Sequence, residues 1–216
     1  MNSESEVRLV ELLCSRLCHD LVSPIGAIHN GLELLAQEEG DMEEEIISLL
    51  SKSSDEASRR LRFFRVAFGQ AGGSAEMLSF TEGRALLDGF LKGGRISLDW
   101  TEKVEPSAPI ARGSVKLLLN MALLASETLP YGGGLAVVPS CHSGGTRLEV
   151  VAHGEKAAFK DGLAEALQRE MPVEDLNPRN VLAYFLAFLA NRFDFALSVR
   201  RDTGAVTLQA THGSEN

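Results

Sequence analysis

Hydrophobic residues recur every three or four positions along the start of the chain, which predicts one long amphipathic helix over residues 4–37. Pro24 lies inside this span and removes only one backbone donor, so the helix can continue through it. On an ideal helix, which turns by about 100° per residue, one apolar stripe lies opposite His19. This stripe of the first predicted helix consists of Val10, Cys14, Leu17, Leu21, Ile25, Ile28, Leu32 and Leu35. We expect it to pack against other helices along its length.

The side of the same helix around His19 carries mainly small or polar residues. We call it the approach surface, and its members are Leu12, Ser15, Arg16, Val22, Ser23, Gly26 and Asn30. Gly26 weakens a helix interior by about 1 kcal/mol relative to Ala. One benefit that offsets this loss is room for a second backbone to come close. The pattern therefore predicts a surface to which another protein can bind, with an imidazole on it.

A second helix is predicted over residues 42–70 by the same spacing. Its apolar stripe consists of Ile46, Leu50, Ser53, Ala57, Leu61, Phe64 and Phe68. The short polar segment 38–41 connects the two helices into an antiparallel hairpin. Because a two-helix hairpin cannot cover the apolar surface of both helices, we expect a homodimer in which two hairpins form a four-helix bundle. The alternative is that the rest of the same chain covers the stripe.

The glycine-rich segment 69–74 ends the helical pattern and predicts a hinge between domain 1–73 and domain 74–216. Beyond it, strand-like and helix-like segments alternate, which predicts an α/β sandwich with helices on one face. The expected strands are 76–80, 96–100, 135–140, 146–152, 195–200 and 205–210. The expected helices are 81–91, 113–128, 156–170 and 177–192. The predicted fold class is α+β, with the helical hairpin first and the sandwich second.

Composition narrows the possible functions. Of the 216 residues, 44% are hydrophobic and 24% are charged, as in ordinary globular proteins. The formal charge of −9 argues against a nucleic-acid partner, which needs clustered Lys and Arg, although several arginines lie close together in 59–65. No apolar run reaches the length of about 18 residues typical of a membrane span, and the first residues lack a signal-peptide core. We therefore expect a cytoplasmic protein without a membrane contact.

The three cysteines do not form a disulfide framework. Cys14 and Cys18 lie one helical turn apart, so a metal site with His29 has to be considered. His29 is about 16 Å along the helix axis from Cys18, too far for a shared ion that is about 2 Å from each ligand. We expect Cys14 and Cys18 to be buried thiols and expect no metal ligands on this chain.

His19, Asp20, Leu21 and Pro24 form an H-D-L-x-x-P motif, which resembles the phosphoacceptor box of sensor histidine kinases. The longer string LCSRLCHDLVSPIGAIHNGLELL resembles the dimeric histidine phosphotransferases of alphaproteobacterial phosphorelays. The resemblance implies that His19 carries a phosphoryl group and that Asp20 orients its ring or takes its proton. It also implies that the partners are the receiver domains of a hybrid histidine kinase and of response regulators. Their magnesium ion would belong to the receiver.

A neutral, exposed imidazole has a ring nitrogen that can attack a phosphoryl group, which agrees with that role. We expect the receiver to cover the approach surface defined above, with help from Arg62 and Arg65 of the second helix. Arg16 is expected either to neutralise phosphate or to be an ordinary solvated arginine. A lone histidine on a helix surface usually has no function; here the motif, the hairpin and the second domain favour the catalytic interpretation.

The second domain resembles the ATP-binding domain of histidine kinases, and its helix KLLLNMALLA (residues 116–125) resembles their asparagine-rich motif. Asn120 occupies the position of the magnesium-binding asparagine, whereas Lys116 replaces another asparagine. The expected Asp-x-Gly-x-Gly turn is Ala-His-Gly-Glu-Lys at 152–156, and segment 171–180 has no glycine to close on a phosphate. We expect no ATP or other cofactor here, and a structural role for Asn120.

Two other functions remain open from the sequence. One is a divergent ATP-dependent histidine kinase, against which the missing glycines and aspartate argue. The other is a non-catalytic dimeric scaffold that only binds receiver domains. Loss of phosphate transfer on replacing His19, with binding retained, would distinguish a phosphotransferase from that scaffold.

Overall fold

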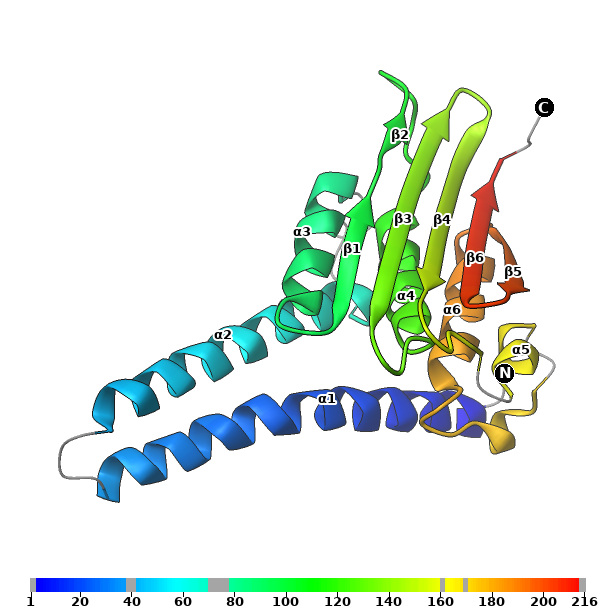
Figure 1. The fold of residues 1–216 in the computed structure, drawn as a ribbon. Coiled ribbons are helices and arrows are strands. Elements are labelled where there is room, and N and C mark those ends of the chain that lie inside the picture. The colour runs from blue at the N-terminus through cyan, green and yellow to red at the C-terminus, as the bar shows by residue number, and fades with distance from the viewer. Residues whose placement is uncertain (1–2, 38–41, 70–77, 160–161, 169–170, 214–216) are drawn as a thin grey trace.

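The computed structural model of the chain describes residues 3–37, 42–69, 78–159, 162–168 and 171–213. Two long helices, α1 (Ser3–Gln37) and α2 (Glu43–Ala67), form an antiparallel hairpin whose connected end projects away from the sheet (Figure 1). Both predicted helices are confirmed, and α1 passes through Pro24 without interruption. The predicted turn at 38–41 and most of the predicted hinge at 69–74 lie outside the described residues.

The second part of the chain is a mixed α/β layer structure, as expected from the alternating pattern. The strands run in the order β1-β3-β4-β6-β5; β1 is parallel to β3, the other neighbours in this order are antiparallel, and β2 also pairs in parallel with β3. The elements are α3 (Phe80–Leu91), β1 (Ile96–Trp100), β2 (Lys103–Val104), α4 (Ser114–Ser126), β3 (Gly133–His142), β4 (Gly145–His153), α5 (Leu163–Leu167), the 3-10 turn η2 (Val173–Asp175), α6 (Val181–Arg192), β5 (Ala196–Asp202) and β6 (Ala205–His212).

One face of this sheet forms the core. Along β3 and β4 every second side chain is buried, among them Leu135, Val137, Leu148 and Val150. Helices α3, α4 and α6 lie against that face (Figure 1). Most residues of α4 and α6 are buried on all sides of the helix, which explains their nearly continuous apolar sequences. No described helix is long and apolar enough to cross a membrane.

Two of the predicted elements are wrong in detail. In the predicted strand 76–80, the described residues lead into a helix, because Ser79 and Glu82 form a capping box that starts α3 at Phe80. Among the described residues of the predicted helix 156–170, only the short α5 is helical. Lys156 and Gly162 both have positive φ angles, so the chain turns at each of them and a continuous helix cannot form. The short strand β2 was not predicted.

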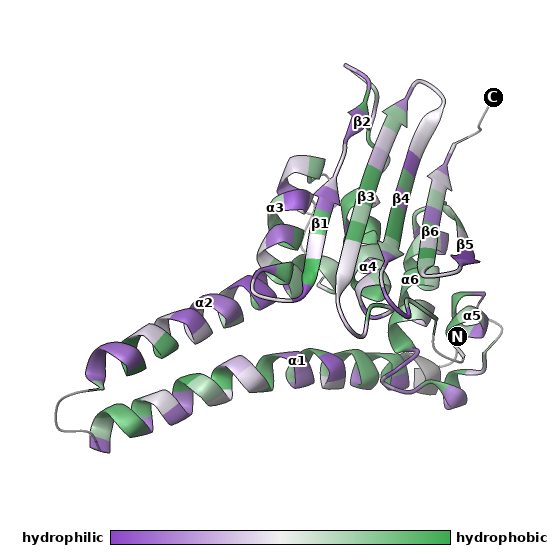
Figure 2. Cartoon of the chain, viewed as in Figure 1, coloured by the Kyte–Doolittle hydropathy of each residue, from purple (hydrophilic) through white to green (hydrophobic). Residues whose placement is uncertain are grey.

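The two apolar stripes of the hairpin have different surroundings. The α2 stripe is mostly covered, with Ile46, Ser53, Ala57 and Phe64 buried. In the α1 stripe, only Leu21 is buried, whereas Val10, Ile25 and Leu32 are more than half exposed. Figure 2 shows hydrophobic residues along all of α1, including the part that extends beyond the sheet. Within one chain, neither α2 nor the second domain covers this stripe.

The prediction that Cys14 and Cys18 are buried is therefore wrong for the single chain. Both thiols are exposed, whereas Cys141 of β3 is buried. Cys14 belongs to the uncovered α1 stripe, and Cys18 lies beside that stripe on the same helix. The prediction of buried thiols requires that another helix or domain covers this side of α1.

The ends of the hairpin helices nearest the sheet are joined to the second domain. At the start of α1, the Arg8 guanidinium donates hydrogen bonds to the carbonyls of Glu174 and Leu176, at 2.9 and 3.0 Å. At the end of α2, aromatic rings continue the sandwich core: Phe63 stacks on Phe90, and Phe68 contacts Phe185 edge to face. The hairpin and the sandwich therefore share one hydrophobic core.

Two side chains of α4 extend this connection. The Asn120 amide donates to the carbonyl of Ala67 at 2.8 Å and to that of Lys116 at 2.9 Å, and the Lys116 ammonium donates to the carbonyl of Gly69. Asn120 is almost completely buried. These bonds satisfy carbonyls at the C-terminal end of α2, which have no partner inside the helix. The expected structural role of Asn120 is confirmed.

We predict that Asn120→Ala lowers the free energy of unfolding by about 2 kcal/mol, because it leaves the buried carbonyl of Ala67 without a donor. Urea unfolding of the full chain measures the change. Asn191→Ala on the exposed end of α6 is the control, with an expected change of at most about 0.5 kcal/mol. Equal effects of both substitutions would contradict the proposed role of this hydrogen bond.

Candidate functional site around His19

The imidazole of His19 is exposed, with 84% of its side chain open to solvent. Its Nδ1 lies 3.0 Å from Oδ1 of Asp20. An ionised carboxylate can only accept a hydrogen bond, so a neutral His19 in this contact carries its proton on Nδ1. Nε2 then keeps its lone pair, and the ring presents a nucleophilic nitrogen.

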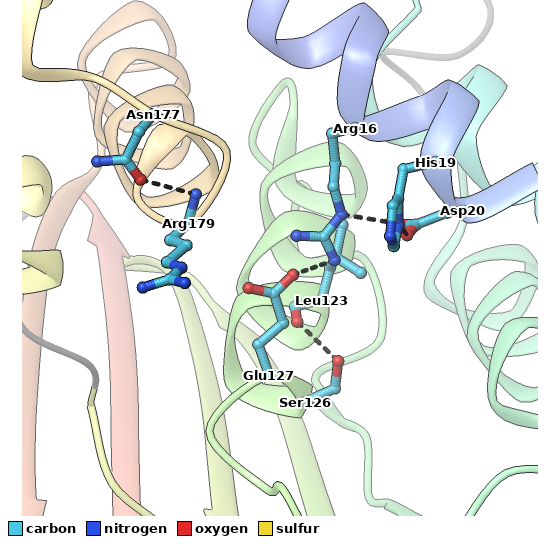
Figure 3. Close-up of polar contacts among 8 residues, drawn as sticks. All are labelled: Arg16, His19, Asp20, Leu123, Ser126, Glu127, Asn177 and Arg179. Atoms are coloured by element: carbon cyan, nitrogen blue, oxygen red, sulfur yellow. Dashed lines mark hydrogen bonds and ion pairs between the residues drawn. The ribbon is translucent and has the colours of Figure 1, made fainter.

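Arg16 holds the carboxylate that contacts His19. Its Nε donates to Oδ2 of Asp20 at 3.0 Å, one helical turn along α1. Its Nη2 pairs with Oε1 of Glu127, which follows α4 in the second domain. Figure 3 shows the guanidinium between Glu127 on one side and Asp20 with His19 on the other. The contacts form a continuous path from the second domain to the imidazole.

The charges in this path are partly removed from water, since the side chains of Arg16, Asp20 and Glu127 are at most one fifth exposed. Burial opposes the positive charge of Arg16, but the carboxylates of Glu127 and Asp20 outweigh it and raise the pKa of Arg16 above its ordinary value. Arg16 is therefore a permanent cation shared by two anions. This is not the solvated arginine that we considered from the sequence, nor is it directed at the approach surface.

Glu127 was missed from the sequence. No periodic pattern connects residues 16 and 127, and only the fold places the end of α4 against α1. One local signal was available: a carboxylate near the C-terminal end of the predicted helix 113–128 is disfavoured by the helix dipole, so a glutamate there favours a nearby cation.

Most of the approach surface is open around His19. Ser15, Val22, Ser23 and Asn30 are exposed, and a Cβ added to Gly26 would have no atom within 4 Å. Leu12 is the exception besides Arg16, because it packs against the hydrophobic core. The structure therefore brings five of the seven predicted residues together on a free surface beside the imidazole.

Arg62 and Arg65 are exposed on α2 but lie elsewhere. They line a groove of about 510 Å³ between α1 and α2, together with Leu17, Leu61, Phe64, Phe68 and Gly69. Leu17 is about 160° around the helix from His19. The groove therefore opens on the side of α1 away from the imidazole, and within one chain these two arginines do not extend the approach surface.

In the segment before α6, where the sequence predicts a missing phosphate loop, two backbone N–H groups are paired with side chains of the same segment. Asn180, which is nearly buried, accepts the backbone N–H of Asn177 at 2.8 Å, and Asn177 accepts that of Arg179 at 2.9 Å. These N–H groups are the kind that would otherwise bind a phosphate. Ala152 is completely buried. Among the described residues, no group of three or more His, Cys, Asp or Glu is placed to hold a metal ion.

Known proteins resemble this chain along nearly all of its length. Residues 80–205 match the family model described as histidine phosphotransferase C-terminal domain. The protein phosphotransferase ChpT of Brucella abortus (strain 2308) is 32% identical over 206 residues, which cover 95% of this chain and 96% of that protein. A 1.7 Å structure described as a bacterial phosphotransferase is 30% identical, with a TM-score of 0.79 and 97% of both chains covered.

A weaker likeness concerns the fold alone. A chain in the crystal structure of histidine kinase ThkA in complex with response regulator protein TrrA is 13% identical, with a TM-score of 0.51. The match covers 97% of this chain and 64% of that chain. The hairpin and sandwich thus occur in the same arrangement of elements in a protein of very different sequence.

We predict that Gly26→Ala raises the free energy of unfolding by about 1 kcal/mol, because Ala is the better helix former and its methyl group meets no atom of the chain. Gly31→Ala is the matched control on the same helix. A Cβ at Gly31 would lie 2.8 Å from Leu50 of α2, so Leu50 must move and the gain is lost. Thermal or urea unfolding distinguishes the two; a destabilised Gly26→Ala would contradict the open surface.

Proposed function

The chain belongs to the histidine phosphotransferase family, whose members transfer phosphoryl groups in a phosphorelay, and we propose that its carrier is the imidazole of His19. The observation that supports this most directly is the exposed ring with its Nδ1 held by Asp20, which leaves Nε2 free to react. The surrounding H-D-L-x-x-P motif resembles the phosphoacceptor box of sensor histidine kinases, which supports the same role for His19. Asp20 is the second residue of the proposed catalytic pair.

The proposed step exchanges one phosphoryl bond for another. The lone pair of Nε2 attacks the phosphorus of an aspartyl phosphate, the P–N bond forms, and the acyl-phosphate P–O bond breaks to release the carboxylate of the donor aspartate. The ring becomes a phosphorylated imidazolium that keeps the proton on Nδ1. Asp20 stabilises this positive charge at 3.0 Å. Transfer to the aspartate of a second receiver reverses these events, so no ATP is consumed.

The proposed partners are the receiver domains of a hybrid histidine kinase and of response regulators. The exposed small residues around His19 leave room for another domain, and the open space at Gly26 would allow its backbone to come close. A fold relative was crystallised as a complex of a kinase with a response regulator. The magnesium ion would be brought by the receiver, since the transfer needs a cation near the phosphoryl oxygens.

The absence of ATP-dependent kinase activity is part of the proposal. Asn120 is committed to the carbonyls of Ala67 and Lys116, and the backbone donors of Asn177 and Arg179 are already paired. Binding of a nucleotide would have to break these contacts. The domain from residue 74 onward would then be a folded support for the phosphotransfer domain 1–73.

We also propose that the chain works as a homodimer. The exposed α1 stripe with Val10, Ile25 and Leu32, and the groove that contains Leu17 and Leu61, lie on the side of the hairpin away from His19. The same surface of a second copy would bind there, and the two copies would bury each other's apolar stripes in a four-helix bundle. His19 would stay accessible on the outside of that bundle.

We predict that His19→Ala abolishes labelling of the chain by a receiver domain that carries ³²P on its aspartate. The control is His29→Ala, which removes an equally solvated histidine on the same helix that pairs with Glu33. It should be labelled like the wild type. The label should be lost in acid and kept in base, as expected of phosphohistidine rather than acyl phosphate.

Two further measurements separate the alternatives. Labelled ATP with magnesium, without a receiver, should leave the wild type unlabelled; incorporation would indicate a histidine kinase. Binding of His19→Ala to the receiver should remain near the wild-type affinity. A wild type that binds the receiver but never carries label would be a scaffold and would overturn the proposed function.

We predict that Leu32→Asp converts the dimer to a monomer, because the dimer would bury an unpaired carboxylate. Sedimentation equilibrium measures the mass. Val22→Asp is the matched control on the approach surface, where 66% of the side chain is exposed. It should stay dimeric but bind the receiver more weakly. The same mass for wild type and Leu32→Asp would exclude the proposed dimer surface.

A further inference from the structure

We infer that Glu127, a residue of the kinase-like second domain, is a positioning residue for His19. It acts through Arg16 and Asp20, and the inference rests on the proposed carrier role of His19. The second domain would therefore contribute to the phosphotransfer site from within its own chain, without nucleotide and without touching the reacting atoms.

Each contact between Glu127, Arg16, Asp20 and His19 uses different atoms. The guanidinium of Arg16 binds Asp20 through Nε and Glu127 through Nη2. The carboxylate of Asp20 accepts from Arg16 on Oδ2 and contacts His19 Nδ1 with Oδ1. Because a carboxylate is planar, the bond at Oδ2 fixes the direction of Oδ1. The rotamer of Arg16 therefore decides whether Asp20 can hold the imidazole, and Glu127 is the group that fixes this rotamer from the other side.

Glu127 is itself rigidly held at the end of α4. On either side of it, the hydroxyl of Ser126 donates to the carbonyl of Leu123, and the hydroxyl of Thr128 donates to that of Ala125, both at 2.7 Å. Thr128 is buried. The same helix is joined to the end of α2 through Asn120. Glu127 therefore cannot shift relative to the hairpin without breaking several buried contacts.

The place of Glu127 is unfavourable for α4 alone. A carboxylate at the C-terminal end of a helix meets the partial negative charge of the free carbonyls, which destabilises the helix. Its side chain is also only 15% exposed. Helix stability does not explain a glutamate there. The pairing with Arg16 explains the glutamate at this position, and this pairing connects the second domain to the helix that carries His19.

The charges give the arrangement a second effect on transfer. Arg16 alone would neutralise Asp20, whereas one cation between two carboxylates leaves a net charge of −1 beside the imidazole. The ring becomes positive when Nε2 forms the bond to phosphorus. A residual negative charge stabilises that state more than the neutral ring, so it favours the transfer step.

The test uses Glu127→Gln in the full chain. The amide keeps the size of the side chain, but without its charge it accepts a weaker hydrogen bond from Arg16 and no longer fixes the Arg16 rotamer. We expect the rate of label transfer from a phosphorylated receiver domain to fall about tenfold while the affinity for that receiver stays unchanged. Arg16→Lys is a second variant: it keeps the positive charge but cannot bridge two carboxylates in the same geometry, and it should be slowed in the same way.

Arg8→Met is the matched control. It removes another polar contact between α1 and the second domain, at the carbonyls of Glu174 and Leu176, and leaves Arg16 intact. It should transfer at the wild-type rate. An equal loss in Arg8→Met would mean that only docking of the two domains matters and would overturn the inference.

A second readout detects the positioning directly. In ¹⁵N spectra recorded with the His19 ring in its neutral form, the wild type should show the Nδ1-protonated tautomer. Glu127→Gln should move His19 toward the tautomer mixture of a free imidazole. Wild-type transfer rates and spectra in Glu127→Gln would refute the role of Glu127 while leaving that of His19 intact. Failure of the wild type to be labelled at all would instead refute the proposed function.

Discussion

The placement of the His19 site on the second domain depends on the ion pair between Arg16 and Glu127, together with the packing of α1 against the shared core. The ion pair joins a helix of the hairpin to the last turn of α4, and it occupies the guanidinium that would otherwise be free to move in solvent. Since both carboxylates and the cation are largely buried, none of the three can lose its partner without leaving a charge poorly solvated. The same contact therefore helps to hold α1 on the second domain and binds the residue that contacts Asp20 beside His19.

Several polar side chains of the second domain bind backbone groups of the hairpin or of their own segment. Asn120 and Lys116 point to the carbonyls at the end of α2, and the segment before α6 is closed by Asn177 and Asn180. These contacts hold protein to protein, and the second domain is also fixed to the hairpin by a shared aromatic core. They agree with the proposal that this domain supports the helix that carries His19.

Three sides of α1 have different surroundings. Near the N-terminal end of α1, one side is taken by the second domain through Leu12 and Arg16. The side around His19 stays open, with Gly26 leaving free space above the helix. The stripe with Ile25 and Leu32 remains exposed in a single chain. This exposed apolar stripe is the surface at which we propose that a second copy binds.

The sequence by itself determined most of the elements and predicted the site residue. Three-and-four spacing located α1 and α2, the motif at 19–24 identified His19 and Asp20, and the missing glycines indicated a domain without its phosphate loop. These are local properties, since periodicity and turn chemistry are set by neighbours along the chain. The tertiary structure decided which faces of α1 are covered, which is why Cys14 and Cys18 are exposed and why Arg16 turns away from the approach surface. It also supplied Glu127, which lies 111 residues beyond Arg16 in the chain and next to it in space. Packing of the sandwich brings these two residues together, and no pattern within either helix contains that information.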